Sequence, residues 1–187
     1  MKKWKKIIID KSNKIRNQKN VKSFYDYSKE MGGYDSNDNY KNKDLFLEKY
    51  LKDRYLILNK YLTENLNINK KTLSIGSGRA INELSLISNK FNVTCSDLQV
   101  PGCYEDSKKI FGSFDYIKFD ILKKKLNVKF DNIFALSSFY IFSNFELEEI
   151  LNNINQIINK EGTLILEFPG SESNFFSFIF NEIFLVF

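Results

Sequence analysis

The stretch that most constrains the fold runs from Thr72 to Ala80 and reads T-L-S-I-G-S-G-R-A. Thr72, Leu73 and Ile75 suit a buried strand, and Gly76-Ser77-Gly78 follows directly. An amphipathic pattern then begins, with apolar residues at Ala80, Ile81, Leu84, Ile87 and Phe91. A Cβ in such a turn would block the tight bend and the approach of a ligand to the backbone, while the helix behind it offers unpaired N–H groups. The order predicts a strand, a glycine turn and a helix, and therefore a candidate cofactor site.

Four more strand-like segments follow the turn, and helical patterns separate most of them. Residues 92–96 end at Asp97, residues 116–119 end at Asp120, and residues 132–136 end at Ser137 and Ser138. The last segment, 163–168, is closed by Pro169. Strands that alternate with helices at this spacing predict right-handed βαβ units. We therefore expect an α/β fold with a doubly wound, mainly parallel sheet of five strands and helices on both faces.

The helix before the last strand has unusually complete signals. Ser143 and Glu146 form a capping box, and Gly162 follows the last predicted turn. A helix over residues 104–111 is also predicted.

The N-terminal third is organised differently. Residues 1 to about 40 show no sustained period, whereas apolar residues recur at helical spacing from Leu45 to about Leu66. We expect one amphipathic helix there, and two regions in the chain. Residues 1–66 would form a basic tail, a loop and a helical cap, and residues 67–187 the cofactor-binding core.

Asp97 lies 19 residues after Gly78. This is close to the interval of about 20 residues at which an acidic side chain meets a ribose diol. A carboxylate suits a diol because it accepts two hydrogen bonds at once. A dinucleotide fingerprint would require glycine at position 81, where this chain has Ile81. The sequence thus favours a ribose-bearing cofactor other than a dinucleotide, with a nicotinamide-dependent oxidoreductase as a less favoured alternative.

With these motifs in order, residues 45–170 resemble the class I S-adenosylmethionine-dependent methyltransferases. The glycine-rich first motif matches residues 76–80, the acidic ends of the second and third strands match Asp97 and Asp120, and residues 130–133 and Gly162 continue the likeness. The resemblance implies a Rossmann-like sheet with strand order 3-2-1-4-5 and S-adenosylmethionine as cofactor. The glycine turn would then face the methionine part and Asp97 the ribose.

By the same resemblance, Asp120 and Ile121 would meet the adenine, and Leu98 would pack against its ring. The full set of predicted cofactor-binding residues is Ser74, Gly76, Ser77, Gly78, Asp97, Leu98, Asp120, Ile121 and Ser137.

The chain departs from the family pattern in three places. Ser74 stands where an acidic residue is usual, Ala80 replaces a third glycine, and Lys160-Glu161-Gly162 replaces a Pro-Gly-Gly. The family's sheet also continues into an antiparallel C-terminal hairpin, which the length after the fifth strand makes us expect to be missing. The Phe-rich segment from Phe175 would then be an incomplete core helix with an exposed apolar face, and a route to a dimer.

The chemistry must proceed without imidazole, because the chain contains no His. The two cysteines show no metal-ligand spacing, so we expect no metal. Methyl transfer to an aligned acceptor is orientation catalysis, and a base is needed only for a neutral hydroxyl or similar acceptor. Ser138 and Tyr140 are the predicted catalytic residues near the methyl group.

The acceptor is predicted to be a small molecule, such as a metabolite or a sugar or lipid precursor. The Ser137-Ser138-Phe139-Tyr140 segment lacks the Pro-Pro-aromatic motif of amino-methylating nucleic-acid enzymes. Eight Lys and Arg residues within the first 20 keep RNA open as an acceptor. A protein acceptor stays open as well, and so does a methyltransferase-like domain that binds a partner without catalysis.

Composition agrees with a protein of the cytoplasm. The formal net charge is +5, no disulfide framework is visible, and no signal peptide is apparent. The longest apolar run, residues 174–187, contains Glu182 and is too short to span a bilayer.

Overall fold

The computed structural model describes residues 42–123, 126–139, 142–168 and 182–186. Within these ranges the helices are α2 (Lys43–Tyr50), α3 (Asp53–Asn65), α4 (Ile81–Ser88), α5 (Tyr104–Phe111) and α6 (Asn144–Ile157). The strands are β1 (Thr72–Ile75), β2 (Val93–Asp97), β3 (Asp115–Lys118), β4 (Phe130–Leu136), β5 (Ile158–Phe168) and β6 (Glu182–Val186). The predicted alternation of strands and helices after residue 72 is therefore confirmed.

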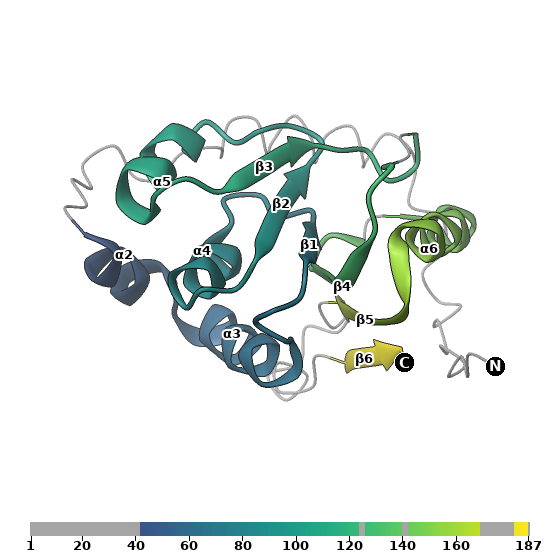
Figure 1. The fold of residues 1–187 in the computed structure, drawn as a ribbon, viewed down its shortest axis with the longest axis horizontal. Coiled ribbons are helices and arrows are strands. Elements are labelled where there is room, and N and C mark those ends of the chain that lie inside the picture. Colours follow the sequence, from purple (N-terminus) through teal and green to yellow (C-terminus); the bar gives the residue numbers. More distant parts are fainter. Residues whose placement is uncertain (1–41, 124–125, 140–141, 169–181, 187) are drawn as a thin grey trace.

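One sheet organises these elements, with the strand order β3-β2-β1-β4-β5-β6 (Figure 1). The first five strands are parallel, which confirms the predicted order 3-2-1-4-5. The strand order reverses between β1 and β4, since β1 pairs with both β2 and β4. Loops that leave β1 and β4 at their carboxyl ends therefore diverge at this point, which is where such sheets bind ligands.

The expectation that the sheet ends at the fifth strand is wrong. β6 pairs antiparallel with β5, from Leu164 opposite Val186 to Phe168 opposite Glu182. Residues 183–186 read I-F-L-V, a composition that favours a strand, and they supply hydrogen-bond partners to the outer edge of β5. The core helix predicted from Phe175 is wrong for residues 182–186, which form a strand. The rest of that prediction, including the proposed dimer contact, lies outside the described residues.

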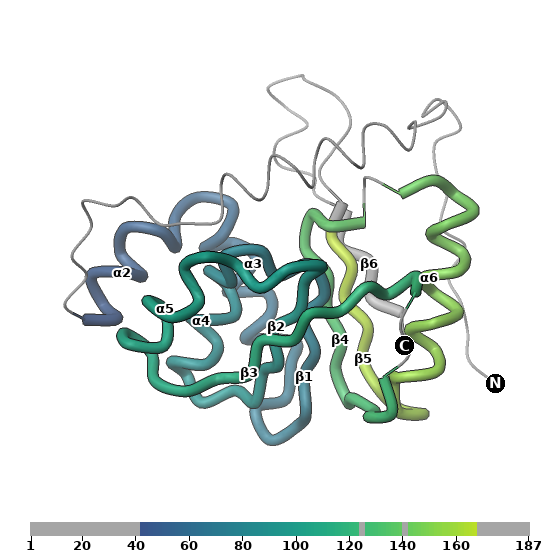
Figure 2. The backbone as a smooth tube through the Cα atoms, turned by 90° about the horizontal axis from the view of Figure 1, so that it is seen from above, coloured from purple at the N-terminus to yellow at the C-terminus, as the bar shows by residue number. Residues whose placement is uncertain are grey.

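The two faces of the sheet bury alternate residues of each strand. Leu73, Ile133 and Leu164 pack in one core with Ile150 and Ile154 of α6. The other core contains their strand neighbours Phe134 and Ile165, with residues of α2, α3 and α4. Viewed from above, α6 lies on one side of the sheet and α2 to α5 on the other (Figure 2). The doubly covered sheet explains why its inner strands read as almost continuous apolar runs.

The single N-terminal helix predicted from Leu45 to Leu66 is two helices. The chain leaves the helical region at Leu51 and Lys52, and Asp53 has a φ of 48°. Phe46 of α2 and Leu62 of α3 are fully buried in the core that they share with α4. The break thus follows from packing against the sheet, which overrides the continuous helical pattern. These helices share a core with residues beyond 66, and the division there stays a prediction.

The junction of α6 and β5 also differs from expectation. The helix ends at Ile157, and β5 begins at once at Ile158, so Gly162 lies inside the strand and does not end the helix. The register shifts between Phe130 and Asn132, where β5 is irregular. A Cβ at position 162 would lie 2.7 Å from the Asp131 carbonyl oxygen. Glycine is needed here for the close approach of two backbones at a bulge.

The predicted capping box at the start of α6 is confirmed. The Ser143 backbone N–H donates to Glu146 Oε2 at 2.8 Å, and the Glu146 N–H donates to Ser143 Oγ at 3.3 Å. Ser143→Ala removes the side-chain acceptor, and we expect it to lower the free energy of unfolding in urea by about 1 kcal/mol. Asn144→Ala is the control, because this exposed side chain should change stability by less than about 0.5 kcal/mol. Equal effects of the two substitutions would contradict a capping role.

Candidate functional site

The glycine turn joins the carboxyl end of β1 to α4. Both glycines adopt left-handed conformations, with φ of 75° at Gly76 and 52° at Gly78. A Cβ at position 76 would lie 2.3 Å from Ser138 Cβ, whereas a Cβ at position 78 would meet no atom within 4 Å. Gly76 therefore allows β1 and β4 to approach each other, and Gly78 leaves open space beside the turn.

The turn is bonded to the end of β2. The N–H groups of Gly76 and Ser77 both donate to the Ser96 carbonyl oxygen, at 2.8 and 2.9 Å. The Gly78 N–H donates to Asp97 Oδ2 at 2.9 Å, and the Leu98 N–H donates to Asp97 Oδ1 at 2.7 Å. The structure thus brings Gly78, Asp97 and Leu98 together, as the sequence spacing predicts.

Asp97 keeps acceptor capacity despite these bonds. A carboxylate has about four lone-pair sites, so two remain for a ligand. Burial raises the pKa of Asp97, and the hydrogen bonds from Gly78 and Leu98 oppose that rise because they stabilise the ionised form. The arrangement fits a pair of donors such as a ribose diol.

The end of β3 lies next to Asp97, but the Asp120 side chain is hydrogen-bonded within the turn that follows β3. The Phe119 N–H donates to the Asp97 carbonyl oxygen at 2.8 Å, which places Asp120 beside the end of β2. Asp120 Oδ1 accepts the Leu122 N–H at 3.1 Å, and Lys123 Nζ is 3.7 Å from Oδ2. The Ile121 side chain is buried in the core under α6. Asp120 is therefore near Asp97, while the side chain of Ile121 packs in the core.

Beneath the turn lies a buried carboxyl group that sequence reasoning missed. Glu83 of α4 is 4% exposed, and the Ser74 hydroxyl donates to its Oε1 at 2.5 Å. Ser74 itself is 1% exposed. It contacts Glu83 inside the protein and does not line the pocket beside the turn. Burial raises the pKa of Glu83 to about 7, with Asp97 adding to the rise and hydrogen bonds from Ser74 and Ser77 opposing it.

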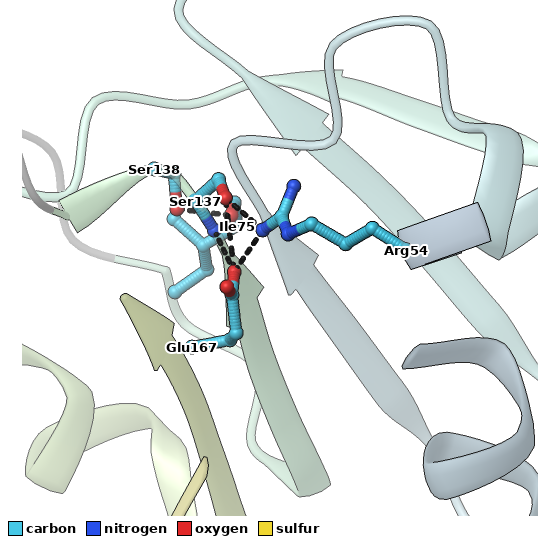
Figure 3. Close-up of polar contacts among 5 residues, drawn as sticks. All are labelled: Arg54, Ile75, Ser137, Ser138 and Glu167. Atoms are coloured by element: carbon cyan, nitrogen blue, oxygen red, sulfur yellow. Dashed lines mark hydrogen bonds and ion pairs between the residues drawn. The ribbon is translucent and has the colours of Figure 1, made fainter. Parts of the chain in front are cut away.

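A second polar cluster connects α3 to the carboxyl ends of β4 and β5 (Figure 3). Arg54 Nη2 donates to Glu167 Oε2 and to Ser137 Oγ. Glu167 Oε2 also accepts the Ser137 N–H and hydroxyl, both at 2.9 Å. Within the described residues, Arg54 Nε and Glu167 Oε1 are buried without a hydrogen-bond partner. Ser137 is thus held by an ion pair that the sequence did not reveal.

The predicted catalytic residues are placed only in part. Ser138 Oγ donates to the Ile75 carbonyl oxygen at 3.1 Å, which holds the end of β4 against the glycine turn (Figure 3). Its hydroxyl can accept a further hydrogen bond but has used its proton. Tyr140 lies outside the described residues. Both catalytic assignments remain predictions.

A pocket of about 190 Å³ opens beside the glycine turn. Its wall comes from α3, the turn, the start of α4 and the end of β4: Arg54, Tyr55, Leu58, Gly76, Ser77, Gly78, Arg79, Ala80, Ile81, Asn82, Glu83, Leu136 and Ser137. Predicted residues Gly76, Ser77, Gly78 and Ser137 line it, whereas Ser74, Asp97, Leu98, Asp120, Ile121 and Ser138 do not. Asn82 Oδ1 is buried and has no hydrogen-bond partner in the described part of the chain.

The missed residues left different traces in the sequence. Glu83 sits among apolar residues at the start of a buried helix, and Glu167 interrupts an otherwise apolar strand. A charged residue on a buried face needs a partner or a shifted pKa, so both positions carried a signal. Arg54 gave none, because it reads as one of several charged residues on a helix surface.

The described residues contain no group of three or more His, Cys, Asp or Glu side chains that could hold a metal ion. No helix among them is long and apolar enough to cross a membrane.

Comparison with solved structures identifies the fold. The 1,6-didemethyltoxoflavin-N1-methyltransferase of Burkholderia thailandensis, with S-adenosylhomocysteine bound, matches with a TM-score of 0.61 at 14% identity, over 82% of this chain and 63% of that chain. DhpI, in a complex with SAM and HEP, gives a TM-score of 0.59 at 10% identity, over 82% and 67%. Coclaurine N-methyltransferase, bound to N-methylheliamine and SAH, gives 0.51 at 18% identity, over 64% and 39%.

The chain thus has the fold of the class I S-adenosylmethionine-dependent methyltransferases. It spans less than two thirds of the length of two of these three proteins, 63% of the 1,6-didemethyltoxoflavin-N1-methyltransferase and 39% of coclaurine N-methyltransferase. No protein-family model matches the sequence, and no curated protein matches it.

The two glycines provide a matched test of the turn. Gly76→Ala adds a backbone strain of about 1–2 kcal/mol and a clash with Ser138 that costs about 1–3 kcal/mol more. Gly78→Ala adds the strain alone, so its loss of stability in urea denaturation should be smaller. Adding Ser138→Gly to Gly76→Ala should restore part of the loss. Equal losses for the two single variants would show that the approach of Ser138 does not constrain the turn.

The raised pKa of Glu83 predicts a pH-dependent stability. Because the folded protein holds this proton up to a pH of about 7 and a free Glu side chain loses it near 4.5, the contribution of Glu83 is fully present below pH 4.5 and is lost as the pH rises to 7. Glu83→Gln should remove that loss, which is on the order of 3 kcal/mol. Urea denaturation between pH 4.5 and 8 measures it. The exposed Glu149→Gln is the control, and parallel profiles of wild type and Glu83→Gln would contradict the prediction.

Proposed function

We propose that this protein is an S-adenosylmethionine-dependent methyltransferase that acts on a small-molecule acceptor without a metal. The observation that carries the proposal is the Asp97 carboxylate, held against the Gly78 N–H at the carboxyl edge of a sheet with the 3-2-1-4-5 order. The fold supports it, as do its structural neighbours, which were solved with SAM or SAH as ligands of those proteins.

The residues at the site fit the parts of this cofactor. Open space beside Gly78 lets a ligand reach the backbone, and the free lone pairs of Asp97 suit the ribose hydroxyls. Asp120 and Leu98, next to Asp97, are the proposed contacts of the adenine. The pocket beside the turn, with Ser77 and Ser137 in its wall, would hold the methionine part.

When bound, S-adenosylmethionine supplies a methyl group that is already electrophilic. The chain then has to orient an acceptor atom in line with the bond that breaks and to exclude water. The ends of β4 and β5, where Arg54, Ser137 and Glu167 meet, are the proposed acceptor side of the site. Because Glu167 is paired with Arg54 and accepts hydrogen bonds from Ser137, its proposed role is to orient a donor group.

A small acceptor is favoured over RNA by the structural neighbours. The names of the neighbours specify methyltransferases of coclaurine, of a glycopeptide and of 1,6-didemethyltoxoflavin. The basic segment of residues 1–20, on which the RNA alternative depends, lies outside the described residues. RNA binding that weakens steeply with added salt would favour that alternative.

Calorimetry with S-adenosylmethionine tests the proposal. We expect binding at about micromolar Kd and a loss of at least about tenfold in Asp97→Ala, since a hydrogen bond to a charged group contributes about 1.5–3 kcal/mol. Asp115→Ala is the matched control, because Asp115 is an exposed carboxylate at the opposite end of the neighbouring strand β3. No heat at millimolar ligand would overturn the proposal and favour a non-catalytic binding domain. Binding of NAD in its place would favour an oxidoreductase.

A further inference from the structure

The most unusual group in the pocket wall is the buried carboxyl group of Glu83. It is 4% exposed, it comes from the first turn of α4, and it lies under the glycine turn. The groups that act on it are the hydroxyls of Ser74 and Ser77, its own backbone N–H and the carboxyl of Asp97. None of these is a cation, so the groups around Glu83 supply no counter-charge to its ionised form.

The other ionisable groups around Glu83 do not supply one either. Cys95 of β2 and Tyr116 of β3 are acids, and burial raises the pKa of both, with a smaller contribution from the charge of Glu83. Arg54 lines the same pocket from α3, but its guanidinium is paired with Glu167. The Arg79 guanidinium lies over the Tyr50 ring, 5.8 Å from its centroid. Burial therefore raises the pKa of Glu83 in the free protein to about 7, so that the group is mostly protonated at pH 6.

Asn82 adds a second observation at the same place. Its side chain is 3% exposed and lines the pocket, and its Oδ1 has no hydrogen-bond partner among the described residues. An unpaired buried acceptor is costly unless a donor arrives, and this one lines the same pocket as the buried carboxyl group of Glu83. The two groups together match a cation that carries several N–H donors, which is the chemistry of an ammonium group.

We propose that Glu83 and Asn82 receive the α-ammonium group of S-adenosylmethionine, and that Glu83 releases its proton to solvent as the cofactor binds. The inference rests on the proposed function. The balance is simple, because the carboxylic acid loses one proton and the carboxylate then pairs with a cation that keeps its own protons. No covalent bond between the protein and the cofactor forms or breaks.

The cofactor carries a second positive charge on its sulfonium, and two arguments place that charge elsewhere. A sulfonium has no N–H or O–H and would leave Asn82 Oδ1 unpaired. A carboxylate beside the sulfonium would also stabilise the reactant more than the transition state, in which that charge disappears, and would slow methyl transfer. The charge of the ammonium does not change in the reaction, so Glu83 can bind it without this cost.

Calorimetry in buffers with different ionisation enthalpies measures the released proton. At pH 6 we expect S-adenosylmethionine to release close to one proton from the wild-type protein, and at pH 7 about half a proton. Its affinity should fall about fivefold between pH 7 and pH 6, a range in which the α-amino group of the cofactor stays mainly protonated, because the proton must leave a group with a pKa of about 7. Glu83→Gln should abolish both effects, while Glu149→Gln, an exposed residue on α6, should keep them.

Two related ligands identify the group that Glu83 meets. S-adenosylhomocysteine keeps the ammonium and lacks the sulfonium, so it should release the same proton. 5′-Methylthioadenosine lacks both charges, so it should release no proton. Because it keeps the ribose, a proton released on its binding would come from Asp97 instead. Asn82→Ala should weaken both ligands that carry the ammonium and leave 5′-methylthioadenosine unchanged.

The outcomes separate this inference from the proposed function. If S-adenosylmethionine does not bind at all, the proposed function fails. If it binds with the same heat in every buffer, only the role of Glu83 fails. Proton release with S-adenosylmethionine but not with S-adenosylhomocysteine would assign Glu83 to the sulfonium and overturn the proposal. Release with 5′-methylthioadenosine would overturn it as well.

Discussion

The close approach of β1 and β4 at Gly76 and Ser138 is the constraint on which the site depends. The two chain segments are so near that a single methyl group at position 76 would overlap Ser138 Cβ. Ser138 Oγ donates to the Ile75 carbonyl oxygen across the same gap. Because β1 and β4 flank the point where the strand order reverses, this contact fixes the position of the turn relative to the diverging loops.

Three buried or half-buried carboxyl groups surround this point, and the structure handles each charge differently. Asp97 accepts hydrogen bonds from backbone N–H groups, and Glu167 pairs with the Arg54 guanidinium. Glu83 accepts hydrogen bonds from the Ser74 hydroxyl and from its own backbone N–H, but burial outweighs them and raises its pKa to about 7. Residues of the same chemical type thus have different surroundings, and in our proposals each meets a different ligand group: a diol, an oriented donor or a cation.

The sequence predicted those parts of the structure that depend on local pattern and spacing. The strands from β1 to β5, α4 and the capping box of α6 follow from periodicity, and the meeting of Asp97 with the glycine turn follows from the length of one βα unit. The break before Asp53 and the role of Gly162 were missed because distant packing decides them. Arg54 and Glu167 are 113 positions apart, and a pairing at that distance has no signal in a single sequence.

The ion pair between Arg54 and Glu167 also has a consequence for how the chain is divided. Glu167 is fully buried, and within the described residues its cationic partner is Arg54 of α3. Removal of one member of a buried ion pair leaves an uncompensated charge, at a cost of about 3–5 kcal/mol. The segment before residue 67 therefore supplies the cation that pairs with a buried carboxylate of the sheet. A fragment that starts at β1 would contain Glu167 without Arg54.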